Sequence, residues 1–333
     1  MTVLVTGAAG FVGSHLIHAL HALGEKVIGI DNFNDYYSPD LKRMRVDSLV
    51  SDSVELIHED LTHSKMIESI VGDIRPRTIY HLAAQAGVRL NLEDNHQYVQ
   101  SNLVGFSNIL ESSIKFGVKN FLYASSSSVY GNSVNVPYSE NDHNISPISF
   151  YGATKLSNEI LASALVRGTS TKARGLRFFT VYGPWGRPDM AYLRLAESLI
   201  NGHQFKLFGS GEAVRDFTYI DDTIRSAIAL GEQLEQVNDP GFADVVNIGG
   251  GKPSSMLELI KAFEEISQQS ITIERFDRIE KDVNQTVADS KRLEMLTKFA
   301  PKIELNDGIA RVFNWAKSSD ISSKLESWTS SVN

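Results

Sequence analysis

The chain has 333 residues, 42% of them hydrophobic and 22% charged, which is enough material for one large or two modest globular domains. The formal net charge of −8 argues against a nucleic-acid partner, and the absence of cysteine excludes disulfides, thiolate catalysis and Cys-type metal sites. The nine histidines have no HxxxH or HExxH spacing, so no metal site is expected.

The opening residues, MTVLVTGAAGFVG, lack the basic and apolar segments of a signal peptide. No apolar run approaches the ~20 residues that a membrane span needs. We therefore expect a soluble, cytoplasmic protein with no membrane partner.

Short apolar runs rich in β-branched and aromatic residues alternate with helical patterns through the first half of the chain. The runs predict strands at residues 3–7, 26–31, 54–60, 78–84, 120–126 and 173–179. The helical patterns include residues 11–24 and 102–117, and another helix is expected to begin near Tyr151. Such alternation is typical of a parallel sheet covered by helices on both faces.

The sequence TGAAGFVG places Gly7, Gly10 and Gly13 between the first expected strand and the first expected helix. A tight strand-to-helix turn needs residues without a Cβ, and a diphosphate can then approach the N–H groups at the helix N-terminus. Asp31 ends the second expected strand, where a carboxylate can accept both ribose hydroxyls and would repel a 2′-phosphate, which favours NAD over NADP. The alternatives are that Asp31 only caps the following turn, and that Asp60, expected near the adenine, is an ordinary loop residue.

After about residue 180 the alternation loosens into Gly- and Pro-rich loops, with helical patterns at 220–235 and 255–267. We predict an α/β fold with a Rossmann-type, doubly wound parallel sheet in residues 1–180 that binds NAD. Residues 181–333 are expected to form a smaller C-terminal α/β lobe that binds the substrate, with some segments returning to the first domain.

Seven segments stand in a fixed order along the chain: TGAAGFVG, HLAAQAGVR, SNLVG, YASSSSVYG, YGATK, LRFFTVYGPWGRPDM and RDFTYIDD. In this order they resemble the extended short-chain dehydrogenase/reductases that act on nucleotide sugars, and the resemblance covers nearly the whole chain. AAQAGVR and VYGPWGRPDMA are most similar to the UDP-glucuronate 4-epimerases. The resemblance implies an isomerase with tightly bound NAD that is regenerated in each turnover. It also implies a homodimer formed through helices near 94–116 and 151–167.

By this resemblance the catalytic residues are Ser126, Tyr151 and Lys155, although an isolated YxxxK is most simply an exposed lysine at a helix start. Tyr151 would take the proton from the sugar O4, with Ser126 as the relay. Lowering a tyrosine pKa from ~10 to ~7 requires about 4 kcal/mol. Lys155, on the same helix face, would supply roughly 3 kcal/mol from ~5 Å at an effective dielectric constant of ~20, and the oxidised nicotinamide ring would supply the rest. Lys155 would also hold the nicotinamide ribose.

The candidate cofactor-binding residues are Gly7, Gly10, Phe11, Val12, Gly13, Asp31, Asn32, Asp60, Leu61, Ala83, Ala84, Gln85, Asn102, Tyr151, Lys155 and Phe178. The candidate substrate-binding residues are Arg89, Ser127, Ser128, Thr180, Arg187, Lys206, Phe208 and Arg215. By the resemblance, Arg215 would bind the diphosphate, Lys206 and Phe208 would line the uracil, and Arg89 would lie near the sugar or the diphosphate.

Ser127 and Ser128 stand where the related dehydratases and decarboxylases carry acidic residues, so elimination and decarboxylation are not expected. What remains is oxidation at C4, rotation of the ketone and hydride return, which would interconvert UDP-glucuronate and UDP-galacturonate. Thr180 and Arg187, together with the two serines, can surround a carboxylate on C5. A rigid bidentate grip on that carboxylate would oppose the rotation.

The runner-up function is 4-epimerisation of a neutral UDP-hexose, such as UDP-glucose and UDP-galactose. A UDP-glucuronate decarboxylase, a dehydratase and a non-catalytic NAD-binding protein are further alternatives. Asp221 and Asp222 are interpreted as helix caps. Arg278 is left unassigned, because Lys281 replaces a glycine that the family usually has in that loop.

Overall fold

The computed structural model describes residues 2–87, 95–278 and 283–331. Seven parallel strands form the central sheet in the order β10-β6-β5-β4-β1-β2-β3. Their bounds are β1 Thr2–Thr6, β2 Lys26–Asp31, β3 Glu55–His58, β4 Thr78–His81, β5 Asn120–Ser126, β6 Lys172–Phe178 and β10 Ala243–Ile248. The strand order reverses beside β1, as in doubly wound nucleotide-binding sheets, so the predicted Rossmann-type fold is confirmed.

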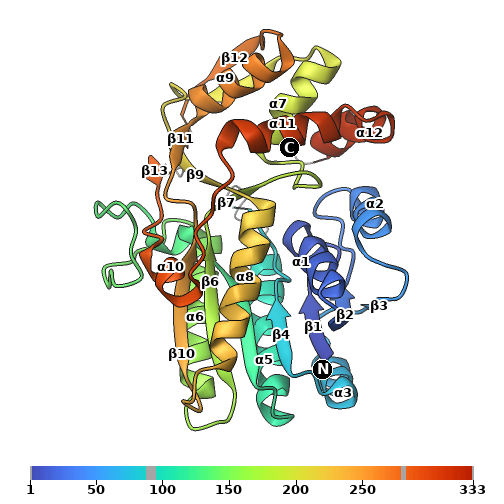
Figure 1. The fold of residues 1–333 in the computed structure, drawn as a ribbon, viewed down its shortest axis with the longest axis vertical. Coiled ribbons are helices and arrows are strands. Elements are labelled where there is room, and N and C mark those ends of the chain that lie inside the picture. Colours follow the sequence, from blue (N-terminus) through green and yellow to red (C-terminus); the bar gives the residue numbers. More distant parts are fainter. Residues whose placement is uncertain (1, 88–94, 279–282, 332–333) are drawn as a thin grey trace.

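Helices cover both faces of this sheet, as Figure 1 shows. One face carries α1 (Phe11–Ala22), α8 (Ile220–Glu235) and α10 (Lys291–Thr297), and the other carries α3 (Ser64–Ile74), α5 (Gly105–Lys115) and α6 (Phe150–Val166). Successive residues of a strand point to opposite faces, so Val3 and Val5 join one buried apolar cluster while Leu4 joins the other. Burial on both sides explains why β1 reads as a continuous apolar run.

The expected helix at 102–117 is the second half of a longer helical segment. It begins as α4 (Asn95–Tyr98), passes through a π-helical stretch (Val99–Val104) and continues as α5. π-Helical turns inside α-helices are frequent near functional sites. Here the stretch contains Asn102, one of the candidate cofactor residues.

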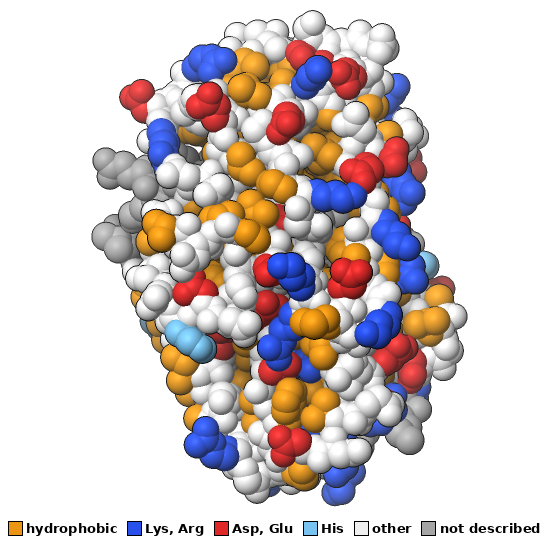
Figure 2. Space-filling view, turned by 60° about the vertical axis from the view of Figure 1, so that its left-hand side comes forward, with side chains coloured by type: hydrophobic (Ala, Val, Ile, Leu, Met, Phe, Trp, Pro, Cys, Tyr) orange, Lys and Arg blue, Asp and Glu red, His pale blue; other side chains and the backbone are white. Residues whose placement is uncertain are grey.

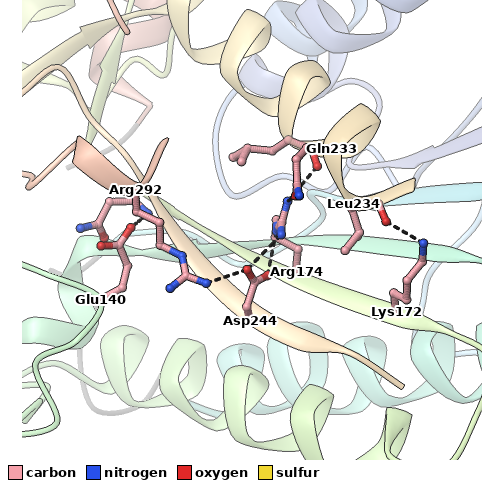
Figure 3. Close-up of polar contacts among 9 residues, drawn as sticks. Glu140, Lys172, Arg174, Gln233, Leu234, Asp244 and Arg292 are labelled. Carbon is pink, nitrogen blue, oxygen red and sulfur yellow. Dashed lines mark hydrogen bonds and ion pairs between the residues drawn. The ribbon is translucent and has the colours of Figure 1, made fainter. Parts of the chain in front are cut away.

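Strand β10 was not predicted from the sequence. It follows α8 and pairs in parallel with β6 at the edge of the sheet. Figure 3 shows the polar contacts that tie this returning segment down: Arg174 Nε binds Asp244 at 2.7 Å, and Arg292 Nη2 binds the same carboxylate at 2.9 Å. Lys172 Nζ donates to the carbonyl of Leu234, at the end of α8, at 2.6 Å. The chain therefore contributes to the central sheet again well after residue 180.

A smaller lobe lies above the carboxyl ends of the central strands in Figure 1. Its strands are β7 (Thr180–Tyr182), β8 (Phe205–Phe208), β9 (Val214–Tyr219), β11 (Pro253–Ser255), β12 (Ile273–Phe276) and β13 (Gln285–Thr286). Its helices are α7 (Ala191–Asn201), α9 (Met256–Ser267), α11 (Leu305–Ala316) and α12 (Ser319–Ser330), while α2 (Pro39–Leu49) packs beside α1. Helix α9 begins with a capping box, in which Ser255 and Glu258 each bond the other's backbone N–H.

No helix in the described part of the chain is long and apolar enough to cross a membrane. The same residues contain no cluster of three or more His, Asp or Glu side chains placed to hold a metal ion. On the face shown in Figure 2, Lys and Arg side chains intermingle with Asp and Glu, and hydrophobic side chains reach the surface between them.

Candidate active site

A cleft of about 1010 Å³ lies between the central sheet and the smaller lobe. Every candidate site residue that the structure describes lines this cleft, with one exception. The exception is Asn102, and Arg89 lies outside the described residues. Residues that are far apart in the sequence are thus brought to a single site, as expected where parallel strands end together at one edge of a sheet.

The glycine-rich turn at the edge of the cleft is so tightly packed against backbone that Gly7 and Gly13 cannot carry a side chain. Gly7 has φ +73°, and a Cβ on it would lie 2.7 Å from the backbone nitrogen of Ala83. A Cβ on Gly13 would lie 2.0 Å from the carbonyl oxygen of Gly7. Gly10 precedes α1, whose first N–H groups face the cleft with the positive end of the helix dipole. This arrangement fits the diphosphate of a dinucleotide.

Asp31, at the end of β2, is oriented by two backbone donors. The N–H of Ala9 donates to Oδ2 at 2.9 Å, and the N–H of Phe33 donates to Oδ1 at 2.8 Å. The contact with Phe33 is the turn-capping role considered from the sequence. Both oxygens of Asp31 keep further lone pairs that can accept ribose hydroxyls.

Asp60 lines the same pocket. Burial raises the pKa of Asp60, but hydrogen bonds from Thr62 and Asn32 outweigh burial and lower this pKa overall, so Asp60 stays ionised.

Asn102 is buried behind the loop that carries Gln85, and it holds this loop through hydrogen bonds. Its Oδ1 accepts the N–H of Gln85 at 2.8 Å, and its Nδ2 donates to the carbonyl of Gln85 at 3.0 Å and to Thr154 at 3.1 Å. It therefore holds the loop that lines the cleft and does not line the cleft itself. The side-chain nitrogen of Gln85 is buried and has no hydrogen-bond acceptor among the described residues, which fits a polar ligand in this part of the cleft.

Ser126, Tyr151 and Lys155 come together where β5 ends and α6 begins. Ser126 Oγ accepts the N–H of Ser128 at 3.1 Å and is hydrogen-bonded to Tyr151. Lys155 Nζ donates to the carbonyl of Ala124 at 2.9 Å and lies 5.8 Å from the centre of the Tyr151 ring. The predicted trio therefore lies together at one part of the cleft.

Burial shifts the pKa values of two members of this trio. Burial raises the pKa of Tyr151, and it is opposed by the Arg187 guanidinium and by the hydrogen bond from Ser126. Burial also lowers the pKa of Lys155 to about 7, so much of the charge that was expected to act on Tyr151 is lost at neutral pH. The prediction that Lys155 and the oxidised nicotinamide ring together lower the pKa of Tyr151 concerns the complex with the cofactor, and it stays a prediction.

The strand end that carries Ser126 rests on a buried ion pair. Ser125 Oγ donates to Glu159 Oε1 at 2.5 Å, and Glu159 binds Arg177 through both oxygens, at 2.9 and 2.8 Å. Arg177 in turn donates to the hydroxyl of Tyr130 at 2.8 Å. Both members of the pair are buried, so their charges cancel locally and fix the position of the serine segment.

Arg187 reaches the cleft from the loop between β7 and α7, paired with Asp189. Its Nε and Nη2 bind the two carboxylate oxygens at 3.0 and 2.5 Å. Asp189 also lines the cleft and was missed by the sequence analysis. The sequence did contain a signal for it, because Asp189 lies two positions after the candidate ligand Arg187 in the segment RPDM.

Arg45 was also missed. It lies on α2, fully buried, and donates to the carbonyls of Ala9 at 2.6 Å, Trp185 at 2.9 Å and Gly186 at 3.3 Å, and to the hydroxyl of Tyr37 at 2.9 Å. One guanidinium thus joins the glycine-rich turn to the loop that carries Arg187. Trp185 has φ +64°, an unfavourable value for a bulky residue, and Arg45 helps to hold it there.

The far end of the cleft is formed by the smaller lobe. Lys206 and Phe208 of β8 line it, as does Arg215, whose Nη1 donates to the carbonyl of Val214 at 2.9 Å. The ring of Phe208 lies 5.4 Å from that of Phe276, which sequence analysis did not single out.

The acidic pair at the start of α8 does not cap that helix. Asp222 Oδ2 instead accepts the backbone N–H groups of Lys302 and Ile303 at 2.7 and 2.8 Å. Asp221 pairs with Arg311 at 3.3 Å. The cap interpretation was therefore wrong, because these carboxylates bind a segment that is distant in sequence.

The family model described as "NAD dependent epimerase/dehydratase family" matches residues 3–249 of the chain. The chain belongs to this family. It is 37% identical to UDP-glucuronate 4-epimerase 4 of Arabidopsis thaliana over 95% of its own length and 75% of that protein. The family membership confirms the resemblance found in the sequence and NAD as the cofactor.

Two solved structures extend this comparison. UDP-glucuronic acid 4-epimerase from Bacillus cereus, in complex with UDP-glucuronic acid and NAD, superposes with a TM-score of 0.87 at 36% identity, covering 95% of this chain and 99% of that one. UDP-glucose 4-epimerase from Thermotoga maritima, with UDP-glucose, superposes with a TM-score of 0.85 at 29% identity, covering 96% and 99%. The fold alone therefore does not distinguish a uronate from a neutral hexose.

Proposed function

We propose that this protein interconverts UDP-glucuronate and UDP-galacturonate by epimerisation at C4. The observation that carries the proposal is the combination of Ser126, Tyr151 and Lys155 with Ser127, Ser128 and Arg187 in one cleft. The similarity to UDP-glucuronate 4-epimerases over nearly the whole chain supports it.

In this proposal Tyr151 accepts the proton of the sugar O4 hydroxyl, with Ser126 hydrogen-bonded between them. The bound NAD would supply hydride transfer at C4. Lys155 would hold the ribose next to the nicotinamide, and the turn with Gly7, Gly10 and Gly13 would hold the diphosphate. After the ketone has rotated, Tyr151 gives the proton back to O4, so the enzyme ends each turnover in its starting protonation state.

The carboxylate on C5 would be held by Ser127, Ser128, Thr180 and Arg187. Positions 127 and 128 offer hydroxyl groups only, so neither can remove a proton from C5 or protonate a departing 6-oxygen. A 4-keto uronate is a β-keto acid and loses CO2 readily once its carboxylate aligns with the ketone π system. We propose that these four residues also hold the carboxylate out of that alignment.

The smaller lobe would bind the UDP moiety, with Arg215 at the diphosphate and Lys206 and Phe208 at the uracil. This agrees with the proposed division of the chain into a cofactor domain, residues 1–180, and a substrate lobe, residues 181–333, from which β10 returns to the central sheet.

We also propose that the enzyme is a cytoplasmic homodimer. On α6, Ile160 is 63% exposed and Leu165 is 36% exposed, and Val104 of the adjacent π-helical stretch is 37% exposed. Apolar side chains that face outward on neighbouring helices suit helix packing between two copies of the chain. Light scattering of the purified protein should give twice the chain mass.

The test is to incubate the purified protein separately with UDP-glucuronate and UDP-glucose and to resolve the products by chromatography and NMR. UDP-galacturonate without any pentose product would support the proposal. Conversion of UDP-glucose alone would favour the neutral-hexose epimerase, whose structural similarity is nearly as high. UDP-xylose or a 4-ketopentose would contradict the argument from Ser127 and Ser128.

A further inference from the structure

The proposed carboxylate ligand, Arg187, already has a carboxylate partner in its own loop. Asp189 binds the Nε and Nη2 side of the guanidinium, with contacts of 3.0 and 2.5 Å. This is a side-on, two-point contact, a bidentate geometry of the kind that makes arginine–carboxylate pairs strong. Both side chains line the cleft and are largely buried, with 23% and 21% of their side-chain surface exposed.

The pair lies next to the reacting groups. The charge on Arg187 lowers the pKa of Tyr151 and that of Tyr36, and the charge on Asp189 raises that of Tyr36, so both charges act on this part of the cleft. Asp189 offsets part of the positive charge of Arg187, so this pair attracts an incoming anion less than a lone arginine would, although Arg194 also lines the cleft and acts on Asp189. Nη1 is the guanidinium nitrogen that Asp189 does not use.

We propose that Asp189 is a specificity-determining and positioning residue, which occupies the Nε and Nη2 side of Arg187 so that the substrate carboxylate can reach the guanidinium only from its Nη1 end. The inference rests on the proposed function, since it concerns how a uronate is held. A guanidinium that is already paired with Asp189 holds the substrate carboxylate less strongly, which lets the carboxylate move while the 4-keto sugar rotates in the cleft. A guanidinium free on both sides would hold one orientation of the sugar more firmly and slow the rotation.

The loop keeps the pair in place independently of the substrate. The N–H of Met190 donates to the carbonyl of Arg187 at 3.2 Å. Arg45 holds the carbonyls of Trp185 and Gly186 just before the pair. A carboxylate that enters the cleft therefore meets a guanidinium whose orientation is already fixed, and it competes with Asp189 for that guanidinium.

A merely structural role for Asp189 makes a different prediction. Asp189 directly precedes Met190, the residue that caps α7, so its charge also favours the helix N-terminus. Loss of that role alone would lower thermal stability and would reduce activity on every substrate alike. The kinetic constants for charged and neutral sugars separate the two roles.

The experiment compares Asp189→Asn and Asp189→Ser with the wild type, using the holoenzyme. Steady-state kcat and KM are measured for UDP-glucuronate, and the Kd of UDP-glucose is measured by calorimetry. Asp221→Asn is the matched control, because it removes a carboxylate from another Asp–Arg pair, Asp221 with Arg311 at 3.3 Å, away from the cleft.

With Arg187 released, we expect KM for UDP-glucuronate to fall about tenfold, the scale of one added charge-assisted hydrogen bond, and kcat to fall by a similar factor. The Kd of UDP-glucose should change less than about twofold, and Asp221→Asn should resemble the wild type. The inference is overturned if KM for UDP-glucuronate rises, or if both sugars are affected equally. The serine variant serves if the asparagine variant does not fold. A wild-type enzyme that leaves UDP-glucuronate unchanged would instead refute the proposed function.

Discussion

Replacing Lys155 by methionine would show by how much the buried amine lowers the free energy of unfolding. Lys155 is 1% exposed, and burial lowers its pKa from 10.5 to about 7. Below pH 7 the native state must hold a protonated amine in this buried position, whereas the unfolded chain keeps the same group in water. At 1.36 kcal/mol per pH unit, the difference between the two pKa values corresponds to about 5 kcal/mol of destabilisation.

The sign of the pH dependence follows from proton binding. Between pH 7 and 10.5 the unfolded chain binds more protons at this lysine than the native state does, so stability rises with pH and the penalty shrinks to roughly 2 kcal/mol at pH 9. Methionine has a similar length and no charge, and it leaves the carbonyl of Ala124 without its donor, at a cost of about 1–3 kcal/mol at every pH. We expect Lys155→Met to be inactive and yet more stable than the wild type at pH 7.

The assay is urea unfolding of the NAD-free protein at pH 7, 8 and 9, followed by fluorescence. The stability advantage of Lys155→Met over the wild type should decrease by about 2 kcal/mol from pH 7 to pH 9. Lys115→Met is the control, since that lysine is 57% exposed in its contact with Glu68 and should give no such slope. A constant difference between wild type and Lys155→Met across this pH range would refute the reasoning.

Three further predictions concern the cofactor and the reaction. Tyr151→Phe should lower turnover of UDP-glucuronate by roughly 10²–10⁴-fold while dialysis shows unchanged affinity for the sugar nucleotide, because only the proton acceptor is lost. Asp31→Asn should reduce the preference for NAD over NADP in fluorescence titrations, since a 2′-phosphate would no longer meet a carboxylate. Arg45→Met should lower the melting temperature by several degrees and raise KM, because the carbonyls of Trp185 and Gly186 lose their buried donor, at about 1–3 kcal/mol each.

Local patterns predicted much of the site from the sequence. The glycines at 7, 10 and 13 belong to a turn in which a Cβ would touch backbone atoms, so their spacing, together with their place between the first strand and the first helix, identifies the turn. Tyr151 and Lys155 share a helix face because they lie four residues apart. Ser126 ends a strand whose neighbours end at the same edge of the sheet. The family resemblance implied the roles of Ser126, Tyr151 and Lys155, and local geometry within one element and its nearest turn is consistent with each position.

Other features depend on contacts between distant segments, which no local pattern records. Arg45 meets Trp185 and Gly186 some 140 positions along the chain. Strand β10 is held in the sheet by its pairing with β6 and by contacts such as that of Arg292 with Asp244. Its apolar run is short, so the sequence did not distinguish this strand from a loop. Burial also shifts the pKa values of Lys155 and Tyr151 in a way that no local pattern records, since desolvation depends on everything packed around them.

Two of the arginines near Tyr151 are held in ion pairs. Arg177 is paired with Glu159 next to the serine segment. Arg187 is paired with Asp189 in the loop between β7 and α7. Lys155, with its pKa lowered to about 7, carries only part of a charge at neutral pH. Burial raises the pKa of Tyr151 despite the opposing effects of Arg187 and of the hydrogen bond from Ser126, so a further positive charge nearby would favour its ionised form. The oxidised form of the cofactor carries such a charge. Its binding would therefore favour deprotonation of O4 at the moment at which a hydride can leave C4.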